Sequence, residues 1–285
     1  MAKAEPSSEV SASTSPGSRP AIEAKNIGRR YGDVAAVDDF SFGVAPGEFF
    51  ALLGPNGAGK STLLHMLTTI IPPTSGTGSV MGFDIVKESS EVRWTLGMVF
   101  QDPAVDDRLT ARENLHIHAV LYGIPRKQRS EAIDRAIEWA SLTETGKRRV
   151  ATFSGGMKRR LELARALMHG PRVLFLDEPT IGLDPQGRRN LWERISTLRS
   201  EGMTVFMTTH NLPEAEACDR VGIMDRGKLV EVGPPHELIE KHGGSENANL
   251  EDVFINLTGR QLRDEVATAR DRLVSFGKKG GEHTR

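Results

Sequence analysis

The 285-residue sequence has one cysteine, almost no net charge and no long apolar run. Because Cys218 has no second cysteine to pair with, an intrachain disulfide is excluded, which fits a reducing compartment. The formal net charge is −1, so no basic field points to nucleic acid, and we expect no nucleic-acid partner. The longest stretch without Asp, Glu, Lys or Arg, residues 61–83, is broken by Pro72, Pro73 and glycines. No membrane-spanning helix is therefore predicted.

The first twenty residues also lack an apolar segment of the kind that a secretory signal needs. Their Ser, Pro, Gly and Ala content predicts a disordered tail over residues 1–20. Any membrane association is therefore expected to be peripheral and to depend on another protein.

The pattern of apolar residues predicts an α/β fold. Residues 22–44 alternate in a way typical of antiparallel strands, and residues 109–140 form two helical patterns separated by Gly123 and Pro125. Short apolar runs predict buried strands at 49–53, 96–100, 173–176 and 204–208. Helices are expected from about Lys60 to Ile70 and from about Pro185 to Ser200. The sequence thus predicts a mainly parallel sheet with an antiparallel β layer and an α-helical subdomain. The expected units are one domain over 21–243, with the helical subdomain at 102–165, and a C-terminal helical extension over 244–285.

A glycine-rich loop follows the predicted strand at 49–53. Residues 54–61, "GPNGAGKS", fit G-x-x-x-x-G-K-[ST] between a strand and a helix. Glycines let successive backbone N–H groups cradle a phosphate chain. Lys60 supplies a cation for the β- and γ-phosphates, and the Ser61 hydroxyl is a hard ligand suited to Mg²⁺.

Two adjacent carboxylates end the predicted strand at 173–176. Asp177 is expected to hold Mg²⁺, and Glu178 to polarise a water for attack on the γ-phosphate. Of the two, the carboxylate near the γ-phosphate can have its pKa raised. These motifs alone leave kinases, GTPases and many ATPases open.

Further motifs narrow the choice. "FSGGM" (residues 153–157) resembles the LSGGQ signature of ATP-binding cassette (ABC) ATPases, and "LDEPTIGLDP" (176–185) resembles their extended Walker B motif and D-loop. Gln101 matches the family's Q-loop, His210 its switch histidine and Tyr31 its adenine-stacking aromatic. All occur in the family order, and the resemblance covers residues 22–238. It implies a P-loop NTPase fold of ABC type, with ATP and Mg²⁺ as cofactors.

The resemblance also implies roles for individual residues. Tyr31 would stack on adenine, Glu178 would be the catalytic base, and His210 would contact the γ-phosphate. The phosphates would be held by the loop residues Gly54, Pro55, Asn56, Gly57, Ala58, Gly59, Lys60, Ser61 and Thr62. The Mg²⁺ ligands would be Ser61, Gln101 and Asp177. A nucleotide on a second subunit would be contacted by Ser154, Gly155 and Gly156, and Asp184 would link the two sites across the dimer.

Several positions allow a plainer interpretation. Tyr31 could be a surface aromatic in a turn, and a histidine at a strand end is often structural. The basic runs at 147–149 and 158–160 are typical of solvated faces. In the signature, Phe153 replaces Leu without a change of chemistry, whereas Met157 replaces Gln and removes a polar contact to the nucleotide sugar.

The finer resemblance is to the ATPases of ABC-2 type exporters, in the daunorubicin-resistance and nodulation subgroup. It rests on residues 101–123 and on the ending "NLEDVFINLTGR" (249–260). It implies the ATPase subunit of an exporter of a drug, lipid or polysaccharide, with a homodimer expected and a separate transmembrane permease as partner. Through that permease the cytoplasmic protein would lie peripherally on the inner face of the cell membrane. The alternative is a non-transport ABC ATPase acting on ribosomes or DNA. A scaffold that binds nucleotide without turnover is a third option, against which Lys60, Glu178 and His210 argue.

Overall fold

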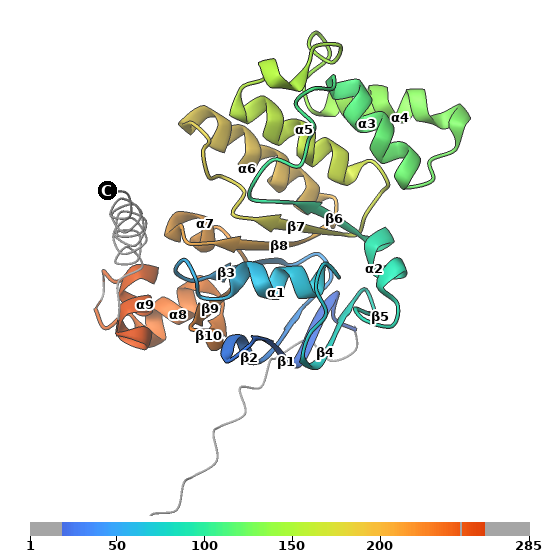
Figure 1. The fold of residues 1–285 in the computed structure, drawn as a ribbon. Coiled ribbons are helices and arrows are strands. Elements are labelled where there is room, and N and C mark those ends of the chain that lie inside the picture. Colours follow the sequence, from blue (N-terminus) through green and yellow to red (C-terminus); the bar gives the residue numbers. More distant parts are fainter. Residues whose placement is uncertain (1–18, 246, 260–285) are drawn as a thin grey trace, which may run out of the picture.

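A six-stranded sheet forms the centre of the computed structural model, which describes residues 19–245 and 247–259 (Figure 1). Its strand order is β10-β9-β3-β8-β7-β6. The strands are β3 (Phe49–Leu53), β6 (Leu96–Val99), β7 (Val173–Asp177), β8 (Thr204–Thr209), β9 (Arg220–Asp225) and β10 (Lys228–Gly233). Only the β9–β10 pair is antiparallel. Strands β3, β7 and β8 are buried at every residue, as expected for a parallel sheet covered on both faces.

A smaller antiparallel sheet packs below this one in Figure 1. Its order is β2-β1-β4-β5, formed by β1 (Ile22–Tyr31), β2 (Val34–Val44), β4 (Ser75–Val80) and β5 (Phe83–Asp84). Aromatic rings join the two sheets: the Phe42 ring centroid lies 5.5 Å from that of Phe50, which stacks at 5.6 Å on Phe206. Burial of each such ring stabilises the folded state by about 1.5–3 kcal/mol.

Helices cover both faces of the central sheet. Helix α1 (Lys60–Leu67) contributes Leu63 and Leu64 to the core shared with the antiparallel sheet. Helix α6 (Pro185–Ser200) and the C-terminal helices pack into a second core on the other face. The other helices of this part of the chain are α2 (Ser89–Thr95), α7 (Leu212–Glu216), α8 (Pro235–His242) and α9 (Leu250–Thr258).

A helical layer lies on the far side of the central sheet from the antiparallel sheet (Figure 1). It consists of α3 (Ala111–Leu121), α4 (Arg126–Trp139), a 3₁₀ turn (Val150–Thr152) and α5 (Gly155–Leu167), with an apolar core of its own. Helix α3 begins with a capping box of Thr110 and Glu113. It ends before Gly123, whose φ of +58° favours glycine. The expected break between two helices is therefore confirmed.

Most predicted elements are present. The helix expected from about Lys60 to Ile70 stops at Leu67. Strand β4 was not predicted because its sequence, "SGTGSV", is typical of a turn, and the short elements β5, α2, α7 and α8 were not predicted either. Of the predicted tail at 1–20, residues 1–18 lie outside the described residues, as does the extension from residue 260. Within the described chain, no helix is long and apolar enough to cross a membrane.

Candidate nucleotide site

The glycine-rich loop, residues 54–61, connects β3 to α1 and is held in place by neighbouring strands. Gly54 N donates to the Thr209 carbonyl at 3.2 Å, and the Ala58 carbonyl accepts from Gly227 N at 2.8 Å. Gly59 has a φ of +105°, and a Cβ there would come within 2.2 Å of a backbone carbonyl of β2. Only glycine fits this position, so the loop is shaped by its close approach to β2.

Lys60 is the cation of the loop and is 4% exposed. Its Nζ donates to the carbonyls of Gly54 at 2.8 Å and Pro55 at 3.0 Å. The same atom lies 3.2 Å from Glu178 Oε1 in an ion pair. The side chain thus closes the loop on itself and joins it to the end of β7.

Glu178 follows β7 with a φ of +44° and is 6% exposed. Its Oε2 accepts a hydrogen bond from His210 Nδ1 at 2.8 Å, so the carboxylate lies between the Lys60 ammonium and the His210 imidazole, which is a second cation when protonated. Burial raises the pKa of Glu178, but the hydrogen bond from His210 and the charge of Lys60 outweigh it, and the pKa is held below its ordinary value. The expectation of a raised pKa is wrong for this arrangement. The Glu178 contact in turn raises the pKa of His210.

Oxygen atoms suited to a magnesium ion meet where α1 begins and β7 ends. Ser61 Oγ donates to Asp177 Oδ1 at 3.2 Å, and Thr208 Oγ1 donates to the same oxygen at 2.5 Å. No group of three or more His, Cys, Asp or Glu in the described residues could hold a metal by itself. A hydroxyl and one carboxylate fit Mg²⁺, which takes its remaining ligands from water and substrate phosphates.

These groups line one cavity of about 420 Å³. The predicted residues on its wall are Asn56, Gly57, Gly59, Lys60, Ser61, Thr62, Gln101, Glu178 and His210. Ala36 and Ile181 complete the lining and were not predicted. Gly54, Pro55 and Ala58 form the backbone of the loop instead, and Asp177 reaches the cavity through its contact with Ser61.

The comparison with known proteins agrees with this geometry. The family of ABC transporters matches residues 37–181. The chain is 41% identical over 249 residues to the linearmycin resistance ATP-binding protein LnrL of Bacillus subtilis (strain 168), an alignment that covers 87% of this chain and 78% of that one. It is 42% identical over 228 residues to the Nod factor export ATP-binding protein I of Rhizobium sp. (strain N33), covering 80% and 75%.

The chain belongs to the ABC transporter family. It is an ATP-binding, ATP-hydrolysing subunit of that family, and its fold is that of an ABC-type P-loop NTPase. A solved ATP-binding subunit of an ABC transporter superposes with a TM-score of 0.75 at 28% identity, covering 83% of this chain and 99% of that one. A dimeric bacterial ABC transporter cassette, MJ0796, superposes with a TM-score of 0.69 at 26% identity, covering 75% and 98%.

The ABC signature residues stand apart from the cavity of their own chain. Ser154 caps α5 through a hydrogen bond from Met157 N at 3.3 Å, and its side chain is exposed. Neither Ser154, Gly155 nor Gly156 lines the cavity. A Cβ on Gly155 would lie 3.7 Å from the Gly182 carbonyl, so the signature lies beside the D-loop.

Two further predicted residues also lie outside the cavity lining. Asp184 caps α6 by accepting from Gly187 N at 2.9 Å and is exposed. Tyr31 is 49% exposed, with the Arg29 guanidinium 4.8 Å from its ring centroid. The structure thus presents an aromatic ring at the surface but does not bring it to the phosphate loop.

Sequence reasoning missed several polar residues that hold the site together. Arg159 was expected on a solvated face, and this is wrong, because its side chain is 6% exposed and hydrogen-bonded to the Pro179 carbonyl at 2.8 Å. The helical spacing of Arg159 with the buried residues Leu163 and Ala166 could have shown this. Glu214 accepts from Thr180 and, at 2.7 Å, from Thr209, and so joins the D-loop to the residue before His210.

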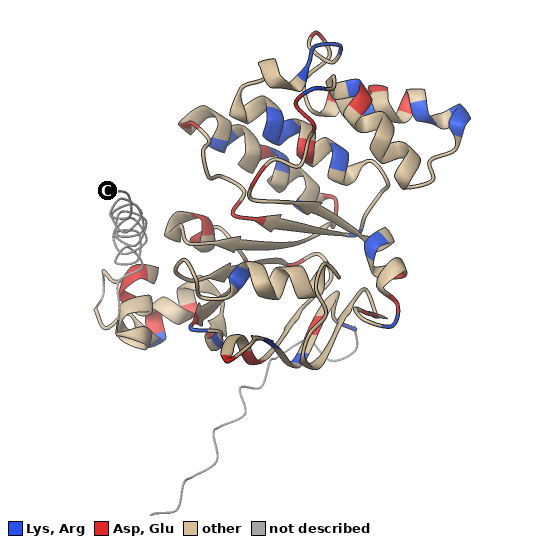
Figure 2. Cartoon of the chain, in the orientation of Figure 1, with Lys and Arg blue, Asp and Glu red and all other residues tan. Residues whose placement is uncertain are grey.

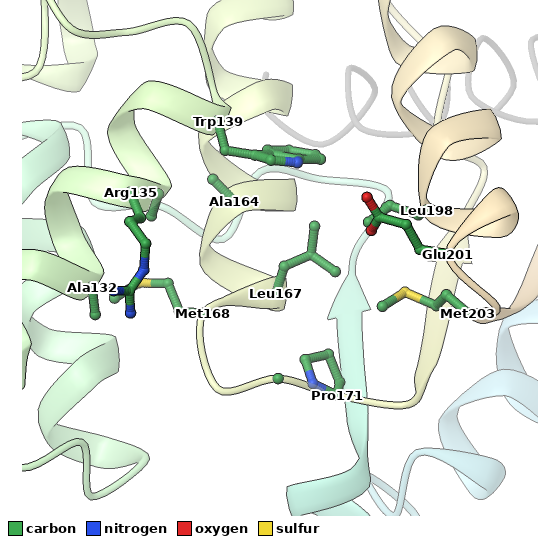
Figure 3. A pocket seen from close by; sticks show the side chains of 12 residues that line it. Ala132, Arg135, Trp139, Ala164, Leu167, Met168, Pro171, Leu198, Glu201 and Met203 are labelled. Atoms are coloured by element: carbon green, nitrogen blue, oxygen red, sulfur yellow. The ribbon is translucent and has the colours of Figure 1, made fainter.

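A second cavity, of about 300 Å³, lies between α4, α5 and the end of α6 (Figure 3). Its wall includes Trp139, Leu167 and Met203, and its charged residues are Arg135 and Glu201. None of the predicted site residues lines it, so it is separate from the nucleotide site.

Proposed function

We propose that this chain hydrolyses MgATP as a head-to-tail homodimer. Each nucleotide would lie between the phosphate loop of one copy and the signature of the other. The observation that carries this proposal is the position of Ser154, Gly155 and Gly156 at a helix N-terminus away from their own cavity, with Ser154 and Gly155 exposed. A helix start of this kind suits an anion. The dimeric state of the MJ0796 cassette supports the same arrangement.

Within one half-site, residues on the cavity wall and two predicted residues outside its lining, Tyr31 and Asp177, would have separate roles. Backbone N–H groups of residues 56–62 and the Lys60 side chain would bind the phosphates, and Tyr31 would stack on adenine. Ser61, Gln101 and Asp177 would hold Mg²⁺, which supplies charge neutralisation on the β- and γ-phosphates.

Glu178 would accept the proton of the attacking water. Its two cationic partners, Lys60 and His210, are also the residues expected to contact phosphate oxygens. When they do so, they neutralise Glu178 less, and burial then raises its pKa. The carboxylate would become a stronger base once substrate is bound.

ATP hydrolysis by this chain would drive a separate membrane permease. An exposed apolar patch supports this: Ile117, Val120 and Leu121 are exposed on α3, and the exposed Trp94 of α2 packs its ring edge-on against Tyr122, the residue after Leu121, at 5.3 Å. Patches of this kind mark interaction sites. We place the protein on the inner face of the membrane, bound through this patch.

The direction of transport follows from relatives named for linearmycin resistance and Nod factor export. We propose an ABC-2 type exporter of a drug, lipid or polysaccharide. Nothing in these comparisons favours the alternative, an ABC ATPase acting on ribosomes or DNA.

Two measurements test the proposal. Glu178→Gln should bind ATP as the wild type does but hydrolyse none, and it should accumulate as a dimer in size-exclusion chromatography with MgATP. A Glu178→Gln chain that hydrolyses ATP at the wild-type rate would show that Glu178 is not the base.

For the permease, the chain should co-purify with a multi-span protein from detergent-solubilised membranes. Leu121→Asp, at a residue that is 74% exposed, should abolish this, whereas Val34→Asp, at 67% exposure outside the patch, should not. Recovery of the wild-type chain only in the soluble fraction, bound to ribosomes, would contradict the exporter function.

A further inference from the structure

Helix α5, which begins at the signature, carries both basic and acidic segments (Figure 2) and contains a buried ion pair. Arg159 Nη1 lies 3.3 Å from Glu162 Oε2, and the Glu162 residue has no exposed surface. A buried pair compensates its desolvation only when its remaining hydrogen bonds are made. The partners of those bonds therefore show what the pair holds.

Arg159 reaches two segments that lead into the nucleotide site. Its Nε donates to the Pro179 carbonyl at 2.8 Å, next to Glu178, and its Nη1 donates to the Phe100 carbonyl, next to Gln101. Its Nη2 makes a third contact, donating to the Asp177 carbonyl at 3.4 Å. One guanidinium thus joins the Q-loop to the end of β7.

Glu162 holds the other side of the Q-loop. Its Oε1 accepts from Ala104 N at 2.7 Å, and the Ala104 carbonyl accepts from Arg165 Nη1 at 2.6 Å. The residues on both sides of Gln101 are therefore bound to one helix.

Gln101 itself is exposed, and no hydrogen bond joins it to another residue of the described chain. Its position is thus set through its neighbours, Phe100 on one side and Ala104 on the other. No other residue of the described cavity lining is hydrogen-bonded to Gln101.

We propose that Arg159 and Glu162 are positioning residues for ATP hydrolysis. They fix the position of Gln101 relative to Glu178, and they bind the segments that carry both residues to α5, the helix that presents the signature. This inference rests on the proposed role of Gln101 in the nucleotide site. It assigns a function to a buried ion pair that touches neither nucleotide nor metal.

The first test needs no nucleotide. Hydrogen exchange of the full chain, read by mass spectrometry over residues 100–106, should accelerate at least about tenfold in Glu162→Ala, because the hydrogen bond from the Ala104 backbone N–H to a buried carboxylate is lost. Glu162→Gln, which keeps an acceptor for Ala104 N, should restore most of the protection. Equal exchange in Glu162→Ala and wild type would overturn the proposal.

The second test is a double-mutant cycle on kcat with Gln101→Ala. If Glu162 acts through Gln101, Glu162→Ala should lower kcat about tenfold or more in the wild-type background and little further in the Gln101→Ala background. The same fold-loss in both backgrounds would mean that Glu162 acts only on stability, and the proposal would fail while the ATPase function stood. Full activity of Gln101→Ala would overturn both the role of Gln101 and the proposal.

A third variant guards against misfolding of the core substitutions. Ala104→Pro removes the N–H group that donates to Glu162 and restrains the backbone only at an exposed loop position, whereas Ala104→Ser keeps the N–H group. Ala104→Pro should show the same kcat loss and the same non-additivity with Gln101→Ala. Wild-type kcat in Ala104→Pro would contradict the proposal, as would an equal loss in Ala104→Ser.

Discussion

Removal of the Lys60 charge should destabilise the chain in the absence of nucleotide, because Glu178 would lose one of its two cations. Both side chains are nearly inaccessible, and their charged atoms lie 3.2 Å apart. Breaking a buried pair costs about 3–5 kcal/mol when nothing compensates. Since His210 keeps its 2.8 Å bond to Glu178 and compensates part of the loss, we expect about 2–3 kcal/mol for Lys60→Met, below most of that range.

The assay is thermal unfolding without nucleotide, for both single variants and for Lys60→Met/Glu178→Gln. At about 2 °C per kcal/mol for a chain of this size, Lys60→Met should lower Tm by about 5 °C. The double variant removes both charges of the buried Lys60–Glu178 pair, so its loss should be smaller than the sum of the single losses by about 2 kcal/mol, or about 4 °C.

A matched cycle on the surface serves as control. Lys158 pairs with Asp107 at 2.7 Å, but Asp107 is half exposed. Lys158→Met and Asp107→Asn should each change stability by less than about 1 kcal/mol. Strict additivity at Lys60 and Glu178 would refute the argument that the nucleotide-free site is held by this ion pair.

Three other predictions concern single positions. His210→Ala should lower Tm most between pH 4.5 and 6.5, and a Tm loss that does not vary with pH would contradict this. The stabilisation from the raised pKa of His210 is full below pH 6.5 and is lost as pH rises through the folded pKa, whereas the stabilisation from the lowered pKa of Glu178 is present above pH 4.5 and is lost on acidification. Gly59→Ala should unfold at a lower temperature than Gly57→Ala, since both have positive φ but only Gly59 would bring a Cβ into a backbone carbonyl; equal Tm values would refute the steric argument. Tyr31→Ala should weaken ATP binding about tenfold in calorimetry and Tyr31→Trp should not, if the ring contributes stacking of about 1–3 kcal/mol; unchanged affinity in Tyr31→Ala would identify the ring as a surface aromatic.

The sequence alone predicted the parallel strands and the phosphate loop. Runs such as Phe49–Leu53 are buried on both faces and need no partner information, and helix α6 begins and ends at the predicted residues Pro185 and Ser200. The family order of the motifs predicted that Lys60 and Glu178 would share one site, and the structure brings them into contact.

Features that depend on tertiary contacts were not predictable in this way. Strand β4 is a strand because β1 pairs with it, although its own residues favour a turn. The pKa of Glu178 depends on two cations that the chain brings from distant positions. The helical spacing of Arg159 could have shown that it is buried, but not which groups it binds, because most of its acceptors are backbone carbonyls of distant segments.

The central claim is that each ATP site combines the phosphate loop of one copy with the signature of another. Lys60→Met should inactivate the first element and Ser154→Arg the second, and each purified variant should lack ATPase activity while Ser154→Arg still binds ATP. A mixture of the two variants should regain activity, because a mixed dimer contains one intact combined site. If no activity returns, and wild-type activity is not reduced by an excess of the Lys60→Met/Ser154→Arg double variant, Ser154 does not serve the nucleotide of a partner copy and the account is contradicted.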